Sequence, residues 1–371
     1  MICFDPESRR KIVRSCRTLF PKRWFHRRGS VISRGLFSPI FLLICVGLFL
    51  GGPGGSPAEA GGKNQRIKFA TLAPEGSTWM KEIHRLADEV KKQTGGRVSF
   101  KFYPGGVSGD ERDVIRKMRI GQIHAAGFTG VGLGEILPQV RVLDLPFLFD
   151  TDSQIQHVYE KMNDYFAAEF EKKGYVLLGW VPVGWIHFFS THDIRTVEDL
   201  RRVKAWMWEG DPLVQETYKA LGVKPIPLSI TDVLMSLQTR LVDTVYSSPQ
   251  GALALQWFTK VKTMSRIRMG YATGGVLISK KKFNSLPEDT REPLKKISAK
   301  YLRELVIMIQ RENAQSVVVL QNNGVKLSVL PGKKELDAFH RAGAVVRKNL
   351  VGKLFHESLL DTVLSALREV K

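Results

Sequence analysis

Blocks of polar and apolar residues follow one another along this chain in a pattern that predicts alternating strands and helices. An apolar run at 67–72 predicts a strand, and Ser77, after the APEGS turn, predicts the start of a helix. The apolar residues of that helix recur at intervals of three and four positions, at Trp79, Ile83, Leu86 and Val90. A strand at 98–103, a helix near 110–120 and a strand at 123–128 follow. This β-α-β-α-β order predicts a parallel sheet with helices covering it.

The alternation of predicted strands and helices continues to the end of the chain. Further strands are predicted at 176–181, 186–190, 203–208, 224–227, 242–246 and 324–330. Further helices are predicted at 152–172, 196–202, 211–220, 229–239, 287–322 and beyond 333. We therefore expect an α/β protein whose last part is helical.

The first 60 residues have a different character. They hold ten Lys and Arg but three acids, then an uncharged apolar run at 40–50, then the small residues Ala58 and Ala60 around Glu59. This order is typical of a secretory signal peptide, and the run is shorter than the ~18–20 residues of a membrane-spanning helix. The sequence therefore predicts a cleaved signal peptide at 1–60 and a periplasmic protein, with an uncleaved anchor as the alternative.

Cysteine use and charge narrow the class further. The three cysteines, Cys3, Cys16 and Cys45, all lie in this leader, so the remainder can form neither disulfides nor thiolate metal sites. Ten of the 56 basic residues and three of the 36 acids are in the leader, which leaves a formal charge of +13. The basic residues are scattered, so we expect a solvated surface, with attraction of anionic solutes or lipid as the alternative. Export argues against nucleic acid as a partner.

Familiar catalytic and cofactor motifs are missing from the sequence. It contains no P-loop, H-E-x-x-H, G-x-S-x-G or EF-hand pattern, and the glycines within 130–134 lack the spacing of a dinucleotide fingerprint. His187 and His192 are too few to define a metal site. Asp110 and Glu111 stand at a predicted helix start, where capping explains them better than acid-base catalysis. We therefore expect a binding protein without metal or cofactor, and not an enzyme.

Several stretches of the chain resemble, in the same order, DctP-type solute receptors of tripartite ATP-independent periplasmic (TRAP) transporters. The stretch FYPGGVSGDERDV at 102–114 is similar to the "yPgg.lG.er" segment of that family. Also similar are ATLAPEGSTWMKE at 70–82, LDLPFLF at 143–149, ALGVKPIPLSITDVLMSLQTRLVD at 220–243 and VLISKKKFNSLPEDTREPLKK at 276–296. The resemblance covers about residues 65–365, and the motifs are specific because they occur together.

The resemblance implies a two-lobed periplasmic-binding-protein fold of the Venus-flytrap kind. Each lobe would be a mixed sheet flanked by helices, and solute would bind in the cleft between the lobes. The expected lobe I is 66–185 with about 270–305, lobe II is 186–269 with about 306–332, and C-terminal helices occupy 333–371. Closure on the solute would then favour docking on a membrane permease.

One departure from the family pattern concerns the ligand. Family members carry an arginine in the strand "LKGLKIRV", where its planar fork grips a substrate carboxylate. Aligning LRRVKAWMW on that strand places Trp206 in the arginine slot. A second family arginine falls at Ile186, and the family asparagine falls at about Ser247. Because such charge-assisted hydrogen bonds contribute ~1.5–3 kcal/mol each, the departure predicts poor binding of a small dicarboxylate such as succinate.

The same departure predicts an apolar, aromatic cleft. A tryptophan brings ~150–250 Å² of surface, which is worth a few kcal/mol against a matching ligand at ~25 cal/mol per Å². The predicted ligand-binding residues are Trp206, Trp208, Trp185, Phe128, Ile186, Glu209, Tyr246, Ser247 and Glu111, with Trp257 as a further candidate. Glu209 would take a polar or cationic head group. A place in the core is the alternative for each aromatic residue, and strand alternation puts Trp206 and Trp208 on one face and Met207 on the other.

We therefore expect a receptor that delivers a bulky apolar or amphiphilic organic solute to the permease subunits of a TRAP transporter. One alternative keeps the receptor but gives it a conventional organic acid of the C4-dicarboxylate type, anchored by Arg112, Arg240 or backbone N–H groups. Another is an exported lipid carrier or sensor without a permease. In lacking the arginine, the chain also resembles a subgroup of these receptors that is associated with a tetratricopeptide-repeat partner protein.

Overall fold

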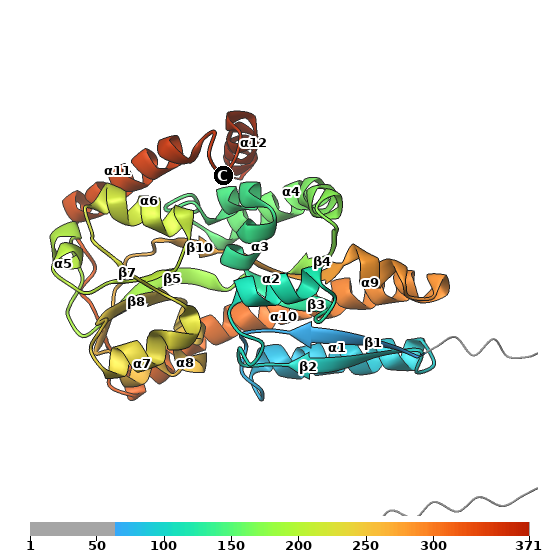
Figure 1. Ribbon diagram of the computed structural model, residues 1–371. Helices are drawn as coiled ribbons and strands as arrows, with labels where there is room; N and C mark the ends of the chain where they lie inside the picture. Colours follow the sequence, from blue (N-terminus) through green and yellow to red (C-terminus); the bar gives the residue numbers. More distant parts are fainter. Residues whose placement is uncertain (1–63, 371) are drawn as a thin grey trace, which may run out of the picture. The chain divides into compact units, whose positions relative to one another are not determined.

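The computed structural model describes residues 64–370, which belong to one compact unit, Ala60–Lys371 (Figure 1). The predicted signal peptide at 1–60 and its three cysteines lie outside the described residues. Among residues 64–370, no helix combines the length and the apolar character needed to cross a membrane.

The first sheet has five strands in the order β2-β1-β3-β11-β4. Its members are β1 (Gln65–Ala70), β2 (Val98–Tyr103), β3 (Ala125–Thr129), β4 (Tyr175–Trp180) and β11 (Gly274–Ser279). β1 pairs in parallel with β2 and with β3, as the sequence predicts. β11 comes from far along the chain and pairs antiparallel with both β3 and β4, which makes the sheet mixed.

The second sheet is built around β5, which pairs antiparallel with β8, β9 and β10. Its members are β5 (Gly184–Ser190), β8 (Thr244–Ser247), β9 (Thr263–Met264), β10 (Gly270–Ala272) and β12 (Lys326–Leu327). A separate parallel pair joins β6 (Trp206–Trp208) to β7 (Ile226–Leu228). The strand predicted at 324–330 is shorter than expected, because only two of its residues pair with β9.

Twelve α-helices and short 3-10 turns surround the sheets within the described residues. The helices are α1 (Thr78–Gln93), α2 (Glu111–Arg119), α3 (Gly130–Ile136), α4 (Asp152–Lys172), α5 (Val197–Arg201), α6 (Pro212–Leu221), α7 (Val233–Gln238), α8 (Pro249–Ala254), α9 (Lys280–Asn284), α10 (Glu288–Asn322), α11 (Lys333–Leu350) and α12 (Glu357–Glu369). The turns are η2 (Pro138–Asp144), η3 (Ile230–Asp232) and η4 (Trp257–Thr259).

Local signals explain where several helices begin. Ser77 caps α1 by accepting a hydrogen bond from the backbone of Met80 at 3.2 Å, as the sequence predicts. Thr151 and Gln154 form a capping box at the start of α4, which begins and ends where predicted. The inner face of α1 buries Ile83 and Val90 against the first sheet.

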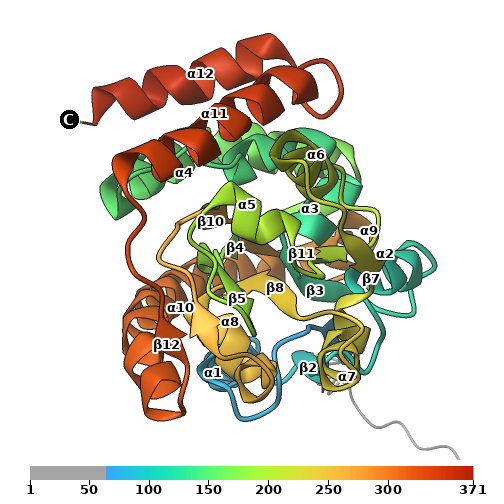
Figure 2. The same cartoon turned by 90° about the vertical axis from the view of Figure 1, so that its left-hand side faces the viewer.

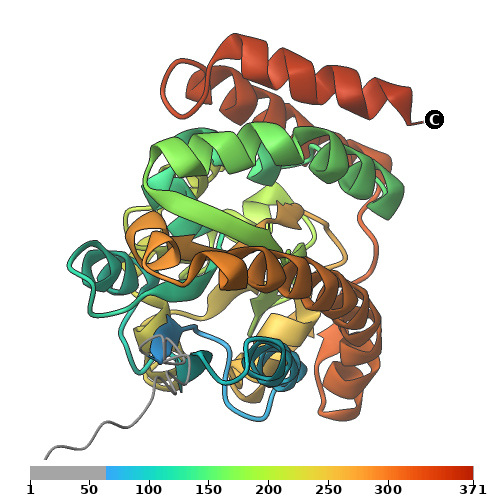
Figure 3. The same cartoon turned by 90° about the vertical axis from the view of Figure 1, so that its right-hand side faces the viewer.

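The long helix α10 contacts both sheets. Its earlier part contributes Leu302 and Ile309 to the apolar cluster under the first sheet, together with α1 and β4. Farther along, Leu320 belongs to a cluster with residues of β6 and β8. Figure 3 shows this helix in orange, running past the green strand β4.

The two C-terminal helices form a layer over α6 and α4. α11 packs against α6, and α12 packs against α4 (Figure 2). Phe339 and Val363 are fully buried in this layer, in the same apolar cluster as Met207 of β6. The predicted helical tail is thus part of the core. The predicted lobe boundaries stay a prediction, because the described chain forms a single unit.

Candidate solute cavity

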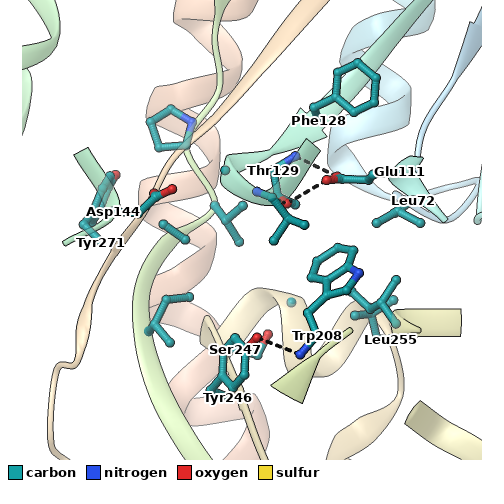
Figure 4. A pocket seen from close by; sticks show the side chains of 18 of the residues that line it. Leu72, Glu111, Phe128, Thr129, Asp144, Trp208, Tyr246, Ser247, Leu255 and Tyr271 are labelled. Carbon is teal, nitrogen blue, oxygen red and sulfur yellow. Dashed lines mark hydrogen bonds between the residues drawn. The ribbon is translucent and has the colours of Figure 1, made fainter. Parts of the chain in front are cut away.

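A cavity of about 250 Å³ lies among elements of both sheets (Figure 4). This volume is slightly below the ~300–1,000 Å³ of ordinary small-molecule sites. Its walls come from the carboxyl ends of β1 and β3, the β4–β5 connection, β6, β8 and the β10–β11 region. Residues from distant parts of the sequence therefore line one partly open cavity.

Trp206 forms part of an aromatic wall of this cavity. Its ring stacks on Tyr246 with centroids 4.7 Å apart and meets Trp257 edge-on at 5.3 Å. The indole N–H donates to the carbonyl oxygen of Leu228 at 3.0 Å, so its polar atom is satisfied within the β6–β7 pair. Trp206 is 1% exposed and lines the cavity, so it is both a core residue and a wall of the cavity.

Trp208 lies on the same wall. The pleat of β6 directs Trp206 and Trp208 to one face, with ring centroids 6.1 Å apart, and sends Met207 to the other face, into the apolar cluster that includes residues of α6. The backbone N–H of Trp208 donates to the Tyr246 hydroxyl at 3.2 Å. Burial raises the pKa of Tyr246 well above its ordinary value, so this phenol stays neutral.

Four other predicted residues also line the cavity, namely Phe128, Ile186, Ser247 and Glu111. The structure does not bring the remaining two, Trp185 and Glu209, to it. Trp185 precedes Ile186 in β5, so the two side chains point to opposite faces. Its indole N–H donates to Asp152 at 2.8 Å, and the Arg268 guanidinium lies 4.8 Å from its ring centre. Glu209 follows the end of β6 and is exposed.

Glu111 is a buried acid at the start of α2. Its carboxylate accepts hydrogen bonds from the backbone N–H and hydroxyl of Thr129 at 2.7 and 2.9 Å, and from Gly132 N–H at 2.7 Å. Burial raises its pKa to about 7, although these hydrogen bonds act in the opposite direction. Glu111 therefore ties α2 to the first turn of α3, and this contact accounts for most of its acceptor capacity.

A charged cluster on the cavity wall was not predicted from the sequence. Arg141 Nε lies 2.9 Å from Asp144 Oδ2, and Arg141 Nη2 donates to Asp211 Oδ2 at 3.0 Å. All three side chains line the cavity and are at least nine-tenths buried. Burial alone would lower the pKa of Arg141, but the charges of Asp211 and Asp144 raise it. The signal that could have found the cluster is the charged pair spaced by three in the apolar segment RVLDLP.

Arg141 is the single basic residue among the residues of 64–370 that line the cavity, and two carboxylates already neutralise it. The two arginines considered from the sequence lie elsewhere. Arg112 donates to the carbonyl oxygen of Gly210 at 2.7 Å and also contacts Glu135, while Arg240 is exposed. The cavity therefore offers no uncommitted guanidinium to a carboxylate ligand.

No group of three or more His, Cys, Asp or Glu side chains is arranged to hold a metal ion within residues 64–370. His187 is buried in β5, and its Nδ1 donates to the carbonyl oxygen of Ser265 at 2.9 Å. Burial lowers the pKa of His187 to about 4, so the ring is neutral near pH 7. His187 is thus a satisfied core residue.

Contacts between α2 and the β6–β7 region lie next to Glu111 and Trp208, which line the cavity. Asp110 Oδ2 accepts hydrogen bonds from Trp208 Nε1 at 2.9 Å and from Ser229 Oγ at 2.8 Å. The Arg112 bond to Gly210 lies beside them. We refer to these three hydrogen bonds as the Asp110 clasp. They join a helix packed on the first sheet to strands that contact the second sheet.

Comparison with known proteins places this fold and cavity in a family. Residues 69–353 match the family described as bacterial extracellular solute-binding protein, family 7, the DctP family. The chain belongs to this family. The family 7 assignment confirms the predicted resemblance to DctP-type receptors of TRAP transporters.

Individual family 7 relatives differ in how much of their length is matched. The chain is 26% identical to the 2,3-diketo-L-gulonate-binding periplasmic protein of Escherichia coli K12 over 302 residues, 81% of this chain and 86% of that protein. It is 30% identical to a solute-binding protein of Chromohalobacter salexigens over 165 residues, 44% of this chain but 49% of that protein. The chain thus spans about half the length of some curated relatives it matches.

Solved structures confirm the predicted two-lobed α/β fold. A TRAP periplasmic solute-binding protein from Pseudomonas putida F1, solved with bound D-glucuronate, superposes with a TM-score of 0.75. The match covers 82% of this chain and 97% of that one at 22% identity, a level at which the likeness concerns the fold.

Proposed function

We propose that this protein is the periplasmic solute receptor of a TRAP transporter, and that it captures a bulky apolar or amphiphilic organic solute. Family membership supports the receptor role and a membrane permease as its partner. A tetratricopeptide-repeat protein is proposed as a further partner only by the likeness to receptors that lack the arginine. Secretion through the leader at 1–60 is part of the same proposal.

The observation that carries the apolar solute is Trp206. It occupies the position where the family resemblance expects a carboxylate-binding arginine, and it lines the cavity beside Trp208, Tyr246 and Trp257. Ile186 lines the cavity at the second expected arginine position. An apolar ligand that covers the aromatic wall would gain ~25 cal/mol for each Å² removed from water.

An organic acid is the second candidate, and the relatives favour it. One relative binds 2,3-diketo-L-gulonate, and a protein of similar fold was solved with D-glucuronate. Such a ligand would have to compete with Asp144 and Asp211 for Arg141, or bind through backbone N–H groups.

Mass spectrometry of solute extracted from the purified protein tests the proposal, together with calorimetric titration of uronic acids, dicarboxylates and amphiphiles. We expect an apolar or amphiphilic molecule to be recovered and to bind again. Trp206→Leu should weaken its binding about tenfold, since roughly half the aromatic surface is removed. The matched control is Trp180→Leu, a tryptophan packed on Tyr159 and Phe166 away from the cavity, which should not change affinity. Recovery of a sugar acid or dicarboxylate, bound equally well by Trp206→Leu, would show that the apolar solute is wrong.

A further inference from the structure

Most polar side chains that line the cavity are already used by the protein. The charged ones bond to one another or to neighbouring backbone groups, as described above. The indole N–H groups of Trp206 and Trp208 donate within the protein, and the hydroxyl of Thr129 donates to Glu111. The hydroxyl of Thr217 donates to a backbone carbonyl of its own helix at 2.8 Å. The polar groups that are still unused therefore indicate where the polar end of a ligand would bind.

Ser247, the last residue of β8, has an unused hydroxyl. It lines the cavity and is 8% exposed, and its Oγ has no hydrogen-bond partner within residues 64–370. The oxygen keeps accessible surface, unlike the unpaired hydroxyl of Ser328, which is completely covered. Gly251 of α8 leaves room for the hydroxyl, because a Cβ at that position would lie 2.6 Å from Ser247 Oγ. Ser247 therefore has both a free donor and a free acceptor at the cavity.

Trp257, in η4, has an unused indole N–H. The residue lines the cavity and is 2% exposed, and its Nε1 has no acceptor in the described part of the chain but keeps accessible surface. Trp79 also lines the cavity without an acceptor for its N–H, but it is more exposed, so water can supply one. A buried donor without an acceptor costs free energy, so Trp257 favours a ligand that brings an acceptor.

The unused groups on this side of the cavity are all uncharged. Gln250 of α8 also lines the cavity, and its side-chain amide makes no hydrogen bond within residues 64–370, although its backbone N–H donates to Asn313. The three groups thus come from the consecutive segments β8, α8 and η4. Among the described residues the lining also holds one basic side chain against three acids. An anionic ligand would find no free positive charge there, whereas an uncharged acceptor loses much less on leaving water.

We propose that Ser247 and Trp257, assisted by Gln250, form a neutral polar anchor, and that the solute is an uncharged molecule with an apolar skeleton and a carbonyl group. This inference rests on the proposed function and specifies the polar end of its solute. The aromatic wall around Trp206 would hold the skeleton, and the anchor would determine which polar group is accepted. The competing view is that Ser247 and Trp257 only fill space, in which case they would affect all ligands of one shape equally.

Equilibrium dialysis at neutral pH with matched ligand sets separates these views. The sets are acetophenone, ethylbenzene and benzoate, and 2-acetylnaphthalene, 2-ethylnaphthalene and 2-naphthoate, so each set holds a ketone, a hydrocarbon and a carboxylate of similar shape. A cavity without the anchor would favour the hydrocarbon, because only the ketone loses hydrogen bonds to water. We expect the ketone to bind at least as tightly as the hydrocarbon, and about tenfold more tightly than the carboxylate.

Two variants test the anchor residues themselves. Ser247→Ala removes a hydroxyl that no protein group uses, and Trp257→Phe removes the N–H but keeps an aromatic ring. Each should lower the ratio of ketone to hydrocarbon affinity about three- to tenfold, the effect of one hydrogen bond. The matched control is Ser328→Ala, which removes a buried and unpaired hydroxyl outside the cavity lining and should leave this ratio unchanged.

Hydrocarbons that bind the unaltered protein more tightly than the ketones would overturn the anchor and leave the apolar receptor standing. An unchanged ratio in both Ser247→Ala and Trp257→Phe would do the same. Carboxylates that bind most tightly would overturn both the anchor and the apolar solute. Binding of no member of either set would also overturn the anchor, whereas the proposed function would still be decided by the extracted solute. The ligand sets give a result on the unaltered protein even if a variant does not fold.

Discussion

Breaking the Asp110 clasp should open the protein in the absence of solute. In Asp110→Asn, one carboxylate oxygen becomes an amide N–H₂ group, which cannot accept from Trp208 and Ser229 while the remaining oxygen caps α2. Each of these hydrogen bonds has a charged acceptor and is worth ~1.5–3 kcal/mol when buried. Both are partly exposed, so we take about 2–3 kcal/mol for the pair, which lowers the ratio of closed to open molecules about 30- to 150-fold.

Distances between two spin labels would measure this change directly. The residues after position 60 contain no cysteine, so cysteines in place of Ile120, at the end of α2, and Met235, in α7, give two unique and exposed attachment sites. Asp113→Asn is the matched control, because it weakens the same capping box but contacts neither β6 nor β7. We expect a longer and broader distance distribution for Asp110→Asn, and the unaltered distribution for the control. Unchanged distances in Asp110→Asn, or the same shift in both variants, would show that the Asp110 clasp does not hold the protein closed.

Three further predictions concern stability. Because the pKa of Glu111 is raised by burial from 4.5 to about 7, its protonated form is favoured in the folded state, and its contribution is fully present below pH 4.5 and lost as pH rises to about 7. The free energy of unfolding should therefore fall by about 3 kcal/mol across that window, and denaturant titrations of Glu111→Gln should show a flatter dependence. Arg141→Met should destabilise the protein by about 3–5 kcal/mol in denaturant melts, since it leaves Asp144 and a second buried carboxylate unpaired, and a loss below 1 kcal/mol would contradict the buried ion pair. Gly184→Ala should cost about 1–3 kcal/mol by thermal melting, because Gly184 has a φ of 117° and an added Cβ would lie 2.6 Å from Asn313 Nδ2, and an unchanged melting temperature would contradict this.

Elements with strong local signals could be predicted from the sequence. α4 begins and ends at the predicted residues 152 and 172, because a capping box opens it and an apolar repeat continues through it. By contrast, β11 was not predicted. Its short run GGVLIS has no local marker, and its partners β3 and β4 lie about 100 residues or more earlier in the chain.

The residues of the cavity likewise include some that the sequence could predict and some that it could not. The period of two in β6 correctly placed Trp206 and Trp208 on one face, and the same rule could have shown that Trp185 and Ile186 cannot share a wall. The place of Arg141 on the cavity wall was not predicted, because its partner Asp211 lies 70 residues farther along the chain, at the cap of another helix. Local periodicity thus locates side chains on a strand or helix, whereas charge partners are decided by tertiary packing.

The course of α10 limits how the two sheets can move. The helix is anchored beneath the first sheet up to Ile309 and beside β6 and β8 from Leu320, so a rotation of one sheet has to be absorbed by the turns between these residues. Asn313 lies within that stretch and is bonded to two other segments, since its Nδ2 donates to Val183 O and its Oδ1 accepts from Gln250 N–H. The helix is therefore held by packing at both ends, and bending would be concentrated in the stretch between them. Bending α10 on opening would cost energy that is regained on closing, so the stiffness of this helix would help to set how readily the proposed receptor closes.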